Sequence, residues 1–130
     1  MSDDRPIDYL SLEDLLEIAE GIIADVGVRD LGLLASAAAR PEMSAFGVDA
    51  YPSFADKAAA LMHSIARNHA LVDGNKRLGW SAARIFCLLN GRDVAFDVDE
   101  AEPLVVSVAA GRLEVPEIAA ALRAHINELA

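Results

Sequence analysis

Three consecutive segments decide the fold: SFADKAAALMHSIARN (residues 53–68), HALVDG (69–74) and NKRLGWSAARIFCLLN (75–90). In the first, apolar residues recur at the spacing of one helix face, and Ser53 is a good N-cap. Asp73-Gly74 is typical of a turn, and Asn90-Gly91 is typical of a helix end. The stretch therefore predicts two helices joined by a loop of six residues.

Patterns on either side predict four further helices, over residues 11–26, 30–40, 98–110 and from about 116 onward. Ser11 is an N-cap for the first, and Asp97 with Glu100 predicts a capping box for the third. Pro116 lies in the first turn of the last, whose inward side chains are expected to be Ile118, Leu122, Ile126 and Leu129. With no repeat or linker in the 130 residues, we predict one compact all-α domain of about six helices over 1–130.

Two stretches do not have helical spacing. Residues 42–52 are punctuated by Gly47, Asp49 and Pro52, which predicts a short, partly extended flap before the central helix-loop-helix. A plain connecting loop is the alternative for this flap. Residues 94–96 are expected to form a short extended piece.

Composition limits the class of protein. Apolar residues make up 54% of the chain and aromatic residues only 5%, so the core must be built mainly from Ala, Leu, Val and Ile. No apolar run approaches the roughly 20 residues that span a bilayer, and the acidic N-terminal residues do not resemble a signal peptide. The single Cys87 cannot form an internal disulfide. We therefore expect a soluble, cytoplasmic protein with no membrane partner.

Charge is distributed unevenly along the chain. The net charge of −10 argues against direct nucleic-acid binding, which needs a basic surface. Residues 57–92 nevertheless carry +5, because Asp73 is their only acid beside Lys57, Arg67, Lys76, Arg77, Arg84 and Arg92. This segment predicts a site for a compact anion, with a chance grouping of solvated charges as the alternative.

The start of the helix after Gly74 has the features of a phosphate site. The first N–H groups of a helix are unpaired and its dipole is positive at that end. Gly74 has no side chain to block an anion. Lys76 and Arg77 lie in the first turn, where cations are unfavourable unless an anion is bound. The loop therefore predicts binding of phosphate groups.

Two further side chains would complete a site for group transfer. Asp73 offers a hard oxygen ligand that suits Mg²⁺ beside phosphates. His69 can take a proton from a hydroxyl nucleophile at neutral pH. Taken singly, each has an ordinary explanation, but the combination favours phosphoryl-type transfer. Outside the loop, Cys87, His63 and His125 are expected to be structural, and Trp80 a core or partner contact.

The loop resembles the signature of the Fic/Doc family, His-Pro-Phe-x-Asp/Glu-Gly-Asn-Gly/Lys-Arg. The matching residues are His69, Asp73, Gly74, Asn75, Lys76 and Arg77, and the departures are Ala70 for Pro and Leu71 for Phe. Similarity extends over residues 26–96, through GVRDLGLL (27–34), DAYP (49–52) and KAAAL (57–61). The resemblance implies the helical fold of this family.

The resemblance also implies an activity. Family members with Gly in place of Lys76 mostly transfer AMP to a target hydroxyl, whereas the Doc branch carries Lys. Doc-like proteins are death-on-curing toxins that phosphorylate elongation factor Tu with the nucleotide reversed, so the resemblance implies an ATP- and Mg²⁺-dependent protein kinase. Trp80 replaces a second arginine of many AMP-transferring members, and Leu16 replaces the hydroxyl residue of the inhibitory motif before Glu20-Gly21. An antitoxin of the prevent-host-death type, supplied in trans, is therefore the expected control.

Roles carry over residue by residue as implications of the resemblance. His69 would be the general base and Asp73 the magnesium ligand, while phosphates or target would contact Gly74, Asn75, Lys76 and Arg77. The flap would dock a target strand through Phe46, Gly47, Val48, Asp49 and Tyr51. Two alternatives stay open: an AMP transferase, and an inactive member that only binds a partner.

Overall fold

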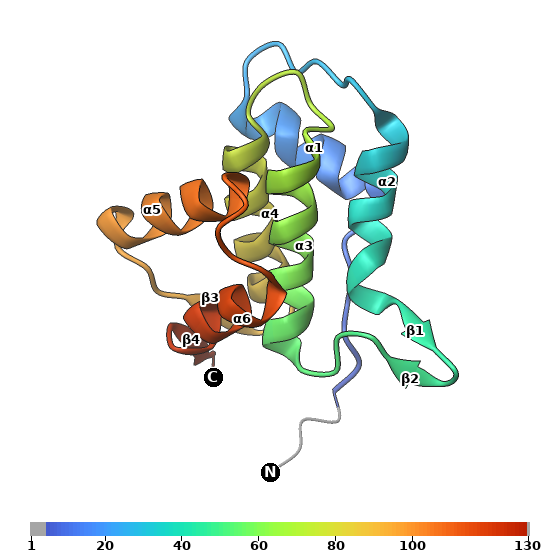
Figure 1. Ribbon diagram of the computed structural model, residues 1–130, viewed down its shortest axis with the longest axis vertical. Helices are drawn as coiled ribbons and strands as arrows, with labels where there is room; N and C mark the ends of the chain where they lie inside the picture. Colours follow the sequence, from blue (N-terminus) through green and yellow to red (C-terminus); the bar gives the residue numbers. More distant parts are fainter. Residues whose placement is uncertain (1–4, 130) are drawn as a thin grey trace.

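The computed structural model describes residues 5–129, in which six α-helices, one short 3₁₀-helix and two small sheets form the fold (Figure 1). The elements in chain order are α1 (Leu12–Ile22), α2 (Leu31–Ala39), η1 (Arg40–Glu42), β1 (Ser44–Ala45), β2 (Val48–Asp49), α3 (Phe54–Asn68), α4 (Asn75–Leu89), β3 (Arg92–Val94), α5 (Val98–Ala109), α6 (Val115–Arg123) and β4 (Ile126–Glu128). The predicted helical fold class is confirmed. No helix of the described part is long and apolar enough to cross a membrane.

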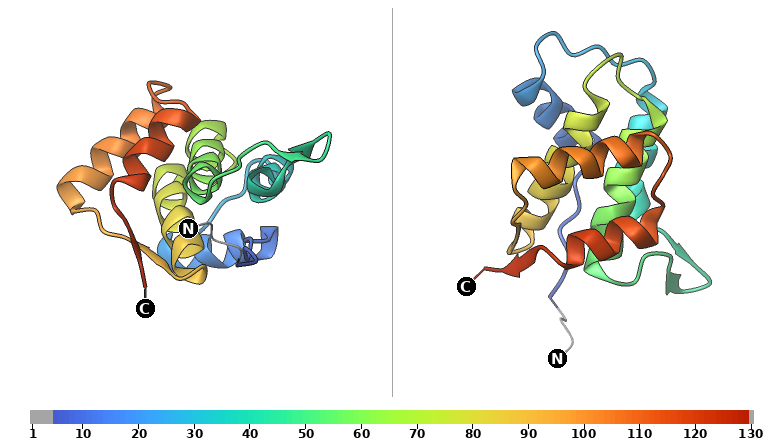
Figure 2. Two further views of the ribbon diagram at one scale, coloured as in Figure 1. Left: turned by 90° about the horizontal axis from the view of Figure 1, so that it is seen from below. Right: turned by 60° about the vertical axis from the view of Figure 1, so that its left-hand side comes forward.

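Helix α3 is the centre of the fold, with α4 packed along it. It lies between α2 on one side and α5 and α6 on the other (Figures 1 and 2). Ser53 caps its start, because the Ser53 hydroxyl accepts a hydrogen bond from Asp56 N at 3.0 Å and the Asp56 carboxylate accepts one from Ser53 N. At its other end His69 adopts φ 52° and ψ 48°, which leaves the helical path. These two residues set the length of the central helix.

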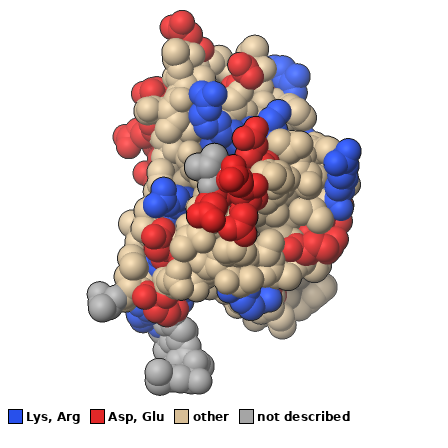
Figure 3. Space-filling model, turned by 90° about the vertical axis from the view of Figure 1, so that its left-hand side faces the viewer, with Lys and Arg blue, Asp and Glu red and all other residues tan. Residues whose placement is uncertain are grey.

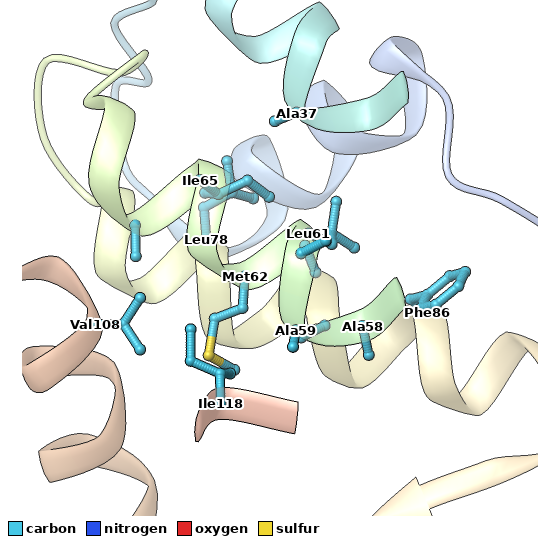
Figure 4. Packing of buried hydrophobic residues seen from close by; sticks show 14 of the residues in the cluster. Ala37, Ala58, Ala59, Leu61, Met62, Ile65, Leu78, Phe86, Val108 and Ile118 are labelled. Atoms are coloured by element: carbon cyan, nitrogen blue, oxygen red, sulfur yellow. The ribbon is translucent and has the colours of Figure 1, made fainter. Parts of the chain in front are cut away.

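The core is built from small side chains, as composition predicted. Ala58, Ala59 and Ala60 of α3 are fully buried, and Figure 4 shows α3 side chains meeting those of α4 and α6. At Gly79 of α4, an added Cβ would lie 3.5 Å from Ala66 Cβ of α3. Small residues on both helices thus allow close approach, and burial of apolar surface at about 25 cal/mol per Å² stabilises the pair.

The flap is a β-hairpin. Strands β1 and β2 are antiparallel, with Ser44 paired to Asp49 and Ala45 to Val48. Phe46 and Gly47 form the two-residue turn, and both have positive φ, 55° and 78°, as the favoured hairpin turns require. Phe46 is fully exposed at the tip. The prediction of a partly extended flap is confirmed.

The C-terminal residues correct one prediction. Helix α6 ends at Arg123, and β4 then pairs antiparallel with β3, Val94 opposite Ile126 and Arg92 opposite Glu128. Ile126 and Leu129 are therefore not members of the helix, and Leu129 is 49% exposed. Backbone pairing with a strand about thirty residues earlier replaces the helical hydrogen bonds there.

The end of one helix, the cap of another and the bounds of one strand also differ from expectation. Helix α1 ends at Ile22 rather than at residue 26, because residues 27–30 bond instead to the loop after α3. Asp97 is the N-cap of α5, but its side chain makes no capping hydrogen bond, so the expected capping box is wrong. The extended piece expected at residues 94–96 is strand β3, Arg92–Val94. Ser11 is confirmed as the N-cap of α1, where it also forms a capping box with Asp14.

Candidate functional site

A cavity of about 670 Å³ lies where the α3–α4 loop, the end of α1 and one face of α5 meet. Its lining residues are Ile23, His69, Val72, Asp73, Gly74, Asn75, Lys76, Arg77, Trp80, Ala101, Glu102, Val105 and Val106. All six residues that match the family signature, in the loop and at the start of α4, are among them. The volume falls within the range usual for pockets that take a small-molecule ligand.

The hairpin is not part of this cavity. None of the five residues expected to dock a target, Phe46, Gly47, Val48, Asp49 and Tyr51, is among the lining residues. The hairpin precedes the start of α3, whereas the loop follows its end, so the 15 residues of that helix separate them (Figure 1). The hairpin therefore takes no part in this cavity, and its expected role in docking a target strand stays a prediction. The segment that does lie against the loop is residues 27–30.

The loop backbone is fixed on one side by residues 27–30. Val72 N donates to Gly27 O at 2.8 Å, and Arg29 N donates to Ala70 O at 2.8 Å. The Arg29 side chain also donates to the His69 carbonyl at 2.6 Å. Few conformations remain to the loop, so little conformational entropy would be lost when a ligand binds.

On the other side, Asn75 holds the loop with its side chain. Its Oδ1 accepts from Leu71 N and its Nδ2 donates to Leu71 O, both at 2.9 Å. Asn75 is 7% exposed and Leu71 is 1% exposed. The amide expected to orient a phosphate is thus engaged with the loop backbone. Leu71 is a buried anchor, so Leu in place of Phe keeps the apolar contact the signature has there.

His69 combines an unusual backbone conformation with a free ring. It is exposed, lines the cavity and has left-handed backbone angles, which non-glycine residues adopt uncommonly. Among residues 5–129, no group is hydrogen-bonded to either ring nitrogen of His69. The imidazole is therefore available to accept a proton from a bound hydroxyl.

Lys76 and Arg77 supply positive charge at the start of α4. Arg77 Nη1 donates to Ile22 O at 3.2 Å, which satisfies a carbonyl at the C-terminal end of α1. Lys76 is exposed and forms no ion pair within the described residues. With the first N–H groups of α4, which have no partner inside the helix, these cations can hold a polyanion.

The wider basic segment, however, does not gather in space. Its other four cations pair with acids elsewhere: Lys57 with Asp49 at 3.4 Å, Arg67 with Glu114 at 3.5 Å, Arg84 with Asp93 at 3.6 Å and Arg92 with Glu128 at 3.3 Å. Helical geometry points residues of one segment in all directions, so closeness in sequence did not become a patch. Only Lys76 and Arg77 of this set line the cavity.

Gly74 is required for packing rather than for ligand access. Its φ of +88° is a conformation that residues with a side chain rarely adopt. A Cβ there would overlap Ile23 Cδ1 and lie 2.9 Å from Ile23 Cγ1. The glycine therefore lets the start of α4 pack directly against the end of α1.

Asp73 is the one carboxylate of the loop. Its Oδ1 accepts a hydrogen bond from Gly74 N at 2.9 Å, and the residue is exposed at the cavity. Within the described residues no group of three potential metal-ligating side chains is found. One carboxylate beside an anion site fits Mg²⁺ that is held jointly with nucleotide phosphates, since Mg²⁺ keeps several water ligands and needs few from protein.

Sequence reasoning missed the apolar walls of the cavity. Trp80 was expected in the core or at a partner, yet it is only partly buried and lines the cavity with Ile23 and α5. A signal was present, because Trp80 follows Arg77 by three residues and Lys76 by four and so shares their helix face. The contribution of Ala101, Glu102, Val105 and Val106 had no such signal, since it depends on how α5 packs.

The other candidate groups are structural, as expected. Burial raises the pKa of the Cys87 thiol to about 12, so it is not a nucleophile at neutral pH. His63 lies between Arg40 Nη1 at 2.8 Å and the Glu114 carboxylate at 2.9 Å. Arg40 can only donate, so His63 Nδ1 accepts and Nε2–H donates to Glu114, whose pKa this hydrogen bond lowers.

Comparison with known proteins agrees with the geometry. Residues 9–87 match the model of the Fic/DOC family. The chain is also 52% identical over 120 residues to a protein of Mycolicibacterium smegmatis described as "Toxin Doc", covering 88% of this chain and 91% of that protein.

Proposed function

The chain belongs to the Fic/Doc family, and on that premise we propose that it is a Doc-type toxin whose activity is protein phosphorylation. It would transfer the γ-phosphoryl group of ATP to a hydroxyl group of a translation factor, with elongation factor Tu as the expected acceptor. The observation that carries the proposal is the free imidazole of His69 in one cavity with Lys76, Arg77 and the start of α4. The toxin role is supported by the 52% identical relative described as Toxin Doc.

The residues divide the chemistry among them. The hydroxyl oxygen of the acceptor bonds to the γ-phosphorus, the bond to the β–γ bridging oxygen breaks, and ADP leaves with that electron pair. His69 accepts the hydroxyl proton as the new bond forms. Lys76, Arg77 and the first N–H groups of α4 stabilise the phosphate charge, and Mg²⁺ held at Asp73 with the phosphates would neutralise more of it.

Lys76 favours γ-phosphoryl transfer over AMP transfer. In the family signature this position distinguishes the Doc branch, and here the Lys76 side chain has no ion pair in the described part of the chain. Trp80 stands where many AMP-transferring members carry a second arginine, and it makes part of the cavity wall apolar. In the AMP-transferring alternative, the hydroxyl would attack the α-phosphorus and pyrophosphate would leave.

Labelled ATP separates the two reactions. The protein is incubated with elongation factor Tu, Mg²⁺ and either γ-³²P or α-³²P ATP, with His69→Ala as the inactive control. We expect label on the acceptor only from the γ position, and none with His69→Ala. Label from the α position would make the protein an AMP transferase. If neither label transfers, and His69→Ala also inhibits growth as strongly as the native chain, the protein is an inactive member that binds a partner.

Control in trans by an antitoxin follows from the missing inhibitory motif. Leu16 and Glu20 lie on α1, and Leu16 offers no hydroxyl to such a motif. We propose that an acidic or amphipathic antitoxin segment, of the prevent-host-death type, folds onto the groove beside the loop in the cytoplasm. Titration calorimetry with the product of the adjacent gene tests this, and absence of binding would exclude that product as the antitoxin.

A further inference from the structure

We propose that the indole ring of Trp80 is the stacking wall for the base of the bound nucleotide. The cavity would then recognise a nucleoside triphosphate by its base as well as by its phosphates. This inference rests on the proposed function only in requiring that a nucleotide enters the cavity.

The position of Trp80 relative to the cations suits a ligand with an anionic end and an aromatic end. Trp80 lies five residues after Asn75 on α4, about 7.5 Å along the helix axis at a rise of roughly 1.5 Å per residue. It lines the same cavity as Lys76 and Arg77. A single phosphate ion is too short to reach both the helix start and the indole, whereas a nucleotide spans that distance.

The ring is held in place before any ligand binds. Phe96 contacts Trp80 edge-on, with ring centroids 5.4 Å apart and ring planes at 89°. Phe96 in turn stacks on His125 at 3.9 Å, and His125 is bonded to the Ala121 carbonyl at 3.0 Å and to Glu100 at 3.1 Å. A fixed ring loses little rotamer entropy on stacking, which favours binding.

The indole still has surface to offer. A perpendicular contact with Phe96 can cover at most one of its two faces, and the residue is only partly buried. No described residue accepts a hydrogen bond from the indole N–H. The indole nitrogen is not among the buried polar atoms that lack a partner in the described residues, so its N–H remains open to solvent or to a ligand.

Other residues that line the cavity suit a flat, largely apolar ring. Helix α5 contributes Ala101, Val105 and Val106, and Ile23, the residue that caps the end of α1, adds to them. Bases stack on aromatic side chains with about 1–3 kcal/mol of affinity per base, which corresponds to roughly 5-fold to 150-fold in Kd. Aliphatic residues in the same cavity would keep water away from the parts of the base that do not stack on the indole.

Charge disfavours phosphates along the α5 wall. Glu102 lines the cavity there, and Asp97, Asp99 and Glu100 are exposed on the same stretch of chain. Figure 3, in which the α5 side of the molecule faces the viewer, shows acidic side chains gathered at the centre, with basic ones directly above. Repulsion from Glu102 favours phosphates at the start of α4 and leaves the α5 side to the uncharged base and sugar.

Trp80 is the only tryptophan of the chain, so its fluorescence reports directly on this contact. Native protein is titrated with Mg-ATP and with inorganic triphosphate, which has no base. We expect ATP to quench the emission strongly and triphosphate to bind, by calorimetry, with little quenching. Trp80→Leu should weaken ATP binding roughly tenfold without changing triphosphate affinity, and Trp80→Phe should retain most ATP affinity.

The outcomes distinguish this inference from the proposed function. Unchanged ATP affinity in Trp80→Leu, with γ-label transfer intact, would overturn the stacking role and leave the kinase proposal standing. Equal loss of ATP and triphosphate binding would make Trp80 a structural residue and also overturn it. Native protein that binds neither ligand and transfers no label would overturn both. Circular dichroism melts show whether Trp80→Leu is folded. If it is not, the stacking role is tested by whether ATP quenches the native emission more than triphosphate does and by whether Trp80→Phe keeps most of the ATP affinity.

Discussion

Asn75→Ala tests whether the loop is held in shape by one buried side chain. The Asn75 amide makes two hydrogen bonds of 2.9 Å, one from Leu71 N and one to Leu71 O. Both residues are almost fully buried, at 7% and 1% exposure. Alanine removes the amide and leaves a backbone N–H and a carbonyl of Leu71 without these partners.

The expected cost follows from those two groups. A buried polar group left unsatisfied costs about 1–3 kcal/mol, so two cost about 2–6 kcal/mol. Water that enters beside the exposed Val72 and Asp73 can satisfy part of the loss, which places the expectation at about 3 kcal/mol. That is a large share of the roughly 5–15 kcal/mol typical of a domain.

Urea unfolding followed by circular dichroism measures this cost. With a slope of about 2 kcal/mol per M, Asn75→Ala should lower the unfolding midpoint by roughly 1.5 M. Asn68→Ala is the matched control, because Asn68 is exposed at the end of α3 and has no side-chain hydrogen bond in the described structure. Its midpoint should change by less than about 0.3 M. Equal midpoints for the two variants would refute the claim that Asn75 holds the loop.

Three further predictions concern other parts of the molecule. Gly74→Ala should lower the free energy of unfolding by about 2 kcal/mol in the same urea assay, because alanine is strained at a φ of +88° and its Cβ meets Ile23. Adding Ile23→Ala should recover part of this free energy, and no recovery would contradict the packing argument. Cys87, buried and with its pKa raised to about 12, should not react with a thiol reagent near pH 8 until urea unfolds the protein; rapid labelling of folded protein would show that the thiol is accessible. The hydrogen bond to the Ala121 carbonyl is the main cause that raises the pKa of His125 above 6.5, and the Glu100 carboxylate adds to it. Protonated His125 therefore contributes its full stabilisation below pH 6.5, and this contribution is lost as pH rises through the higher pKa of the folded state. The difference in unfolding free energy between native protein and His125→Gln should be larger near pH 5.5 than near pH 8.5, and a constant difference would contradict the linkage between folding and protonation of His125.

Local patterns were sufficient for the central helices and for most of the loop. The N-caps Ser11 and Ser53 act over three residues, so their prediction needed no tertiary information, and both are confirmed. The turn at Asp73-Gly74 places His69 and Lys76 at one cavity because two helix ends joined by a short loop must lie close together. The partly extended flap before α3, which the structure shows as the hairpin of β1 and β2, is equally local.

Long-range pairing overrode local pattern at two places. Ile126 has helical spacing after Leu122, but it pairs with Val94 as a strand. Residues 27–30, expected between helices, bind the loop backbone and end α1 early. Both outcomes depend on hydrogen bonds between residues that are distant in sequence, which periodicity does not encode.

By itself the sequence determined the helical class, the alanine-rich core, and the loop that carries an imidazole, a carboxylate and two cations at the start of a helix. These depend on interactions within a few residues and on the period of apolar side chains. Only the tertiary structure decided that four of the six basic residues pair with acids away from the cavity, that Gly74 packs on Ile23, and that Trp80 and α5 form the apolar walls. The physical reason is that a cavity is the space left between packed elements, and its walls are set by how α1, α4 and α5 meet.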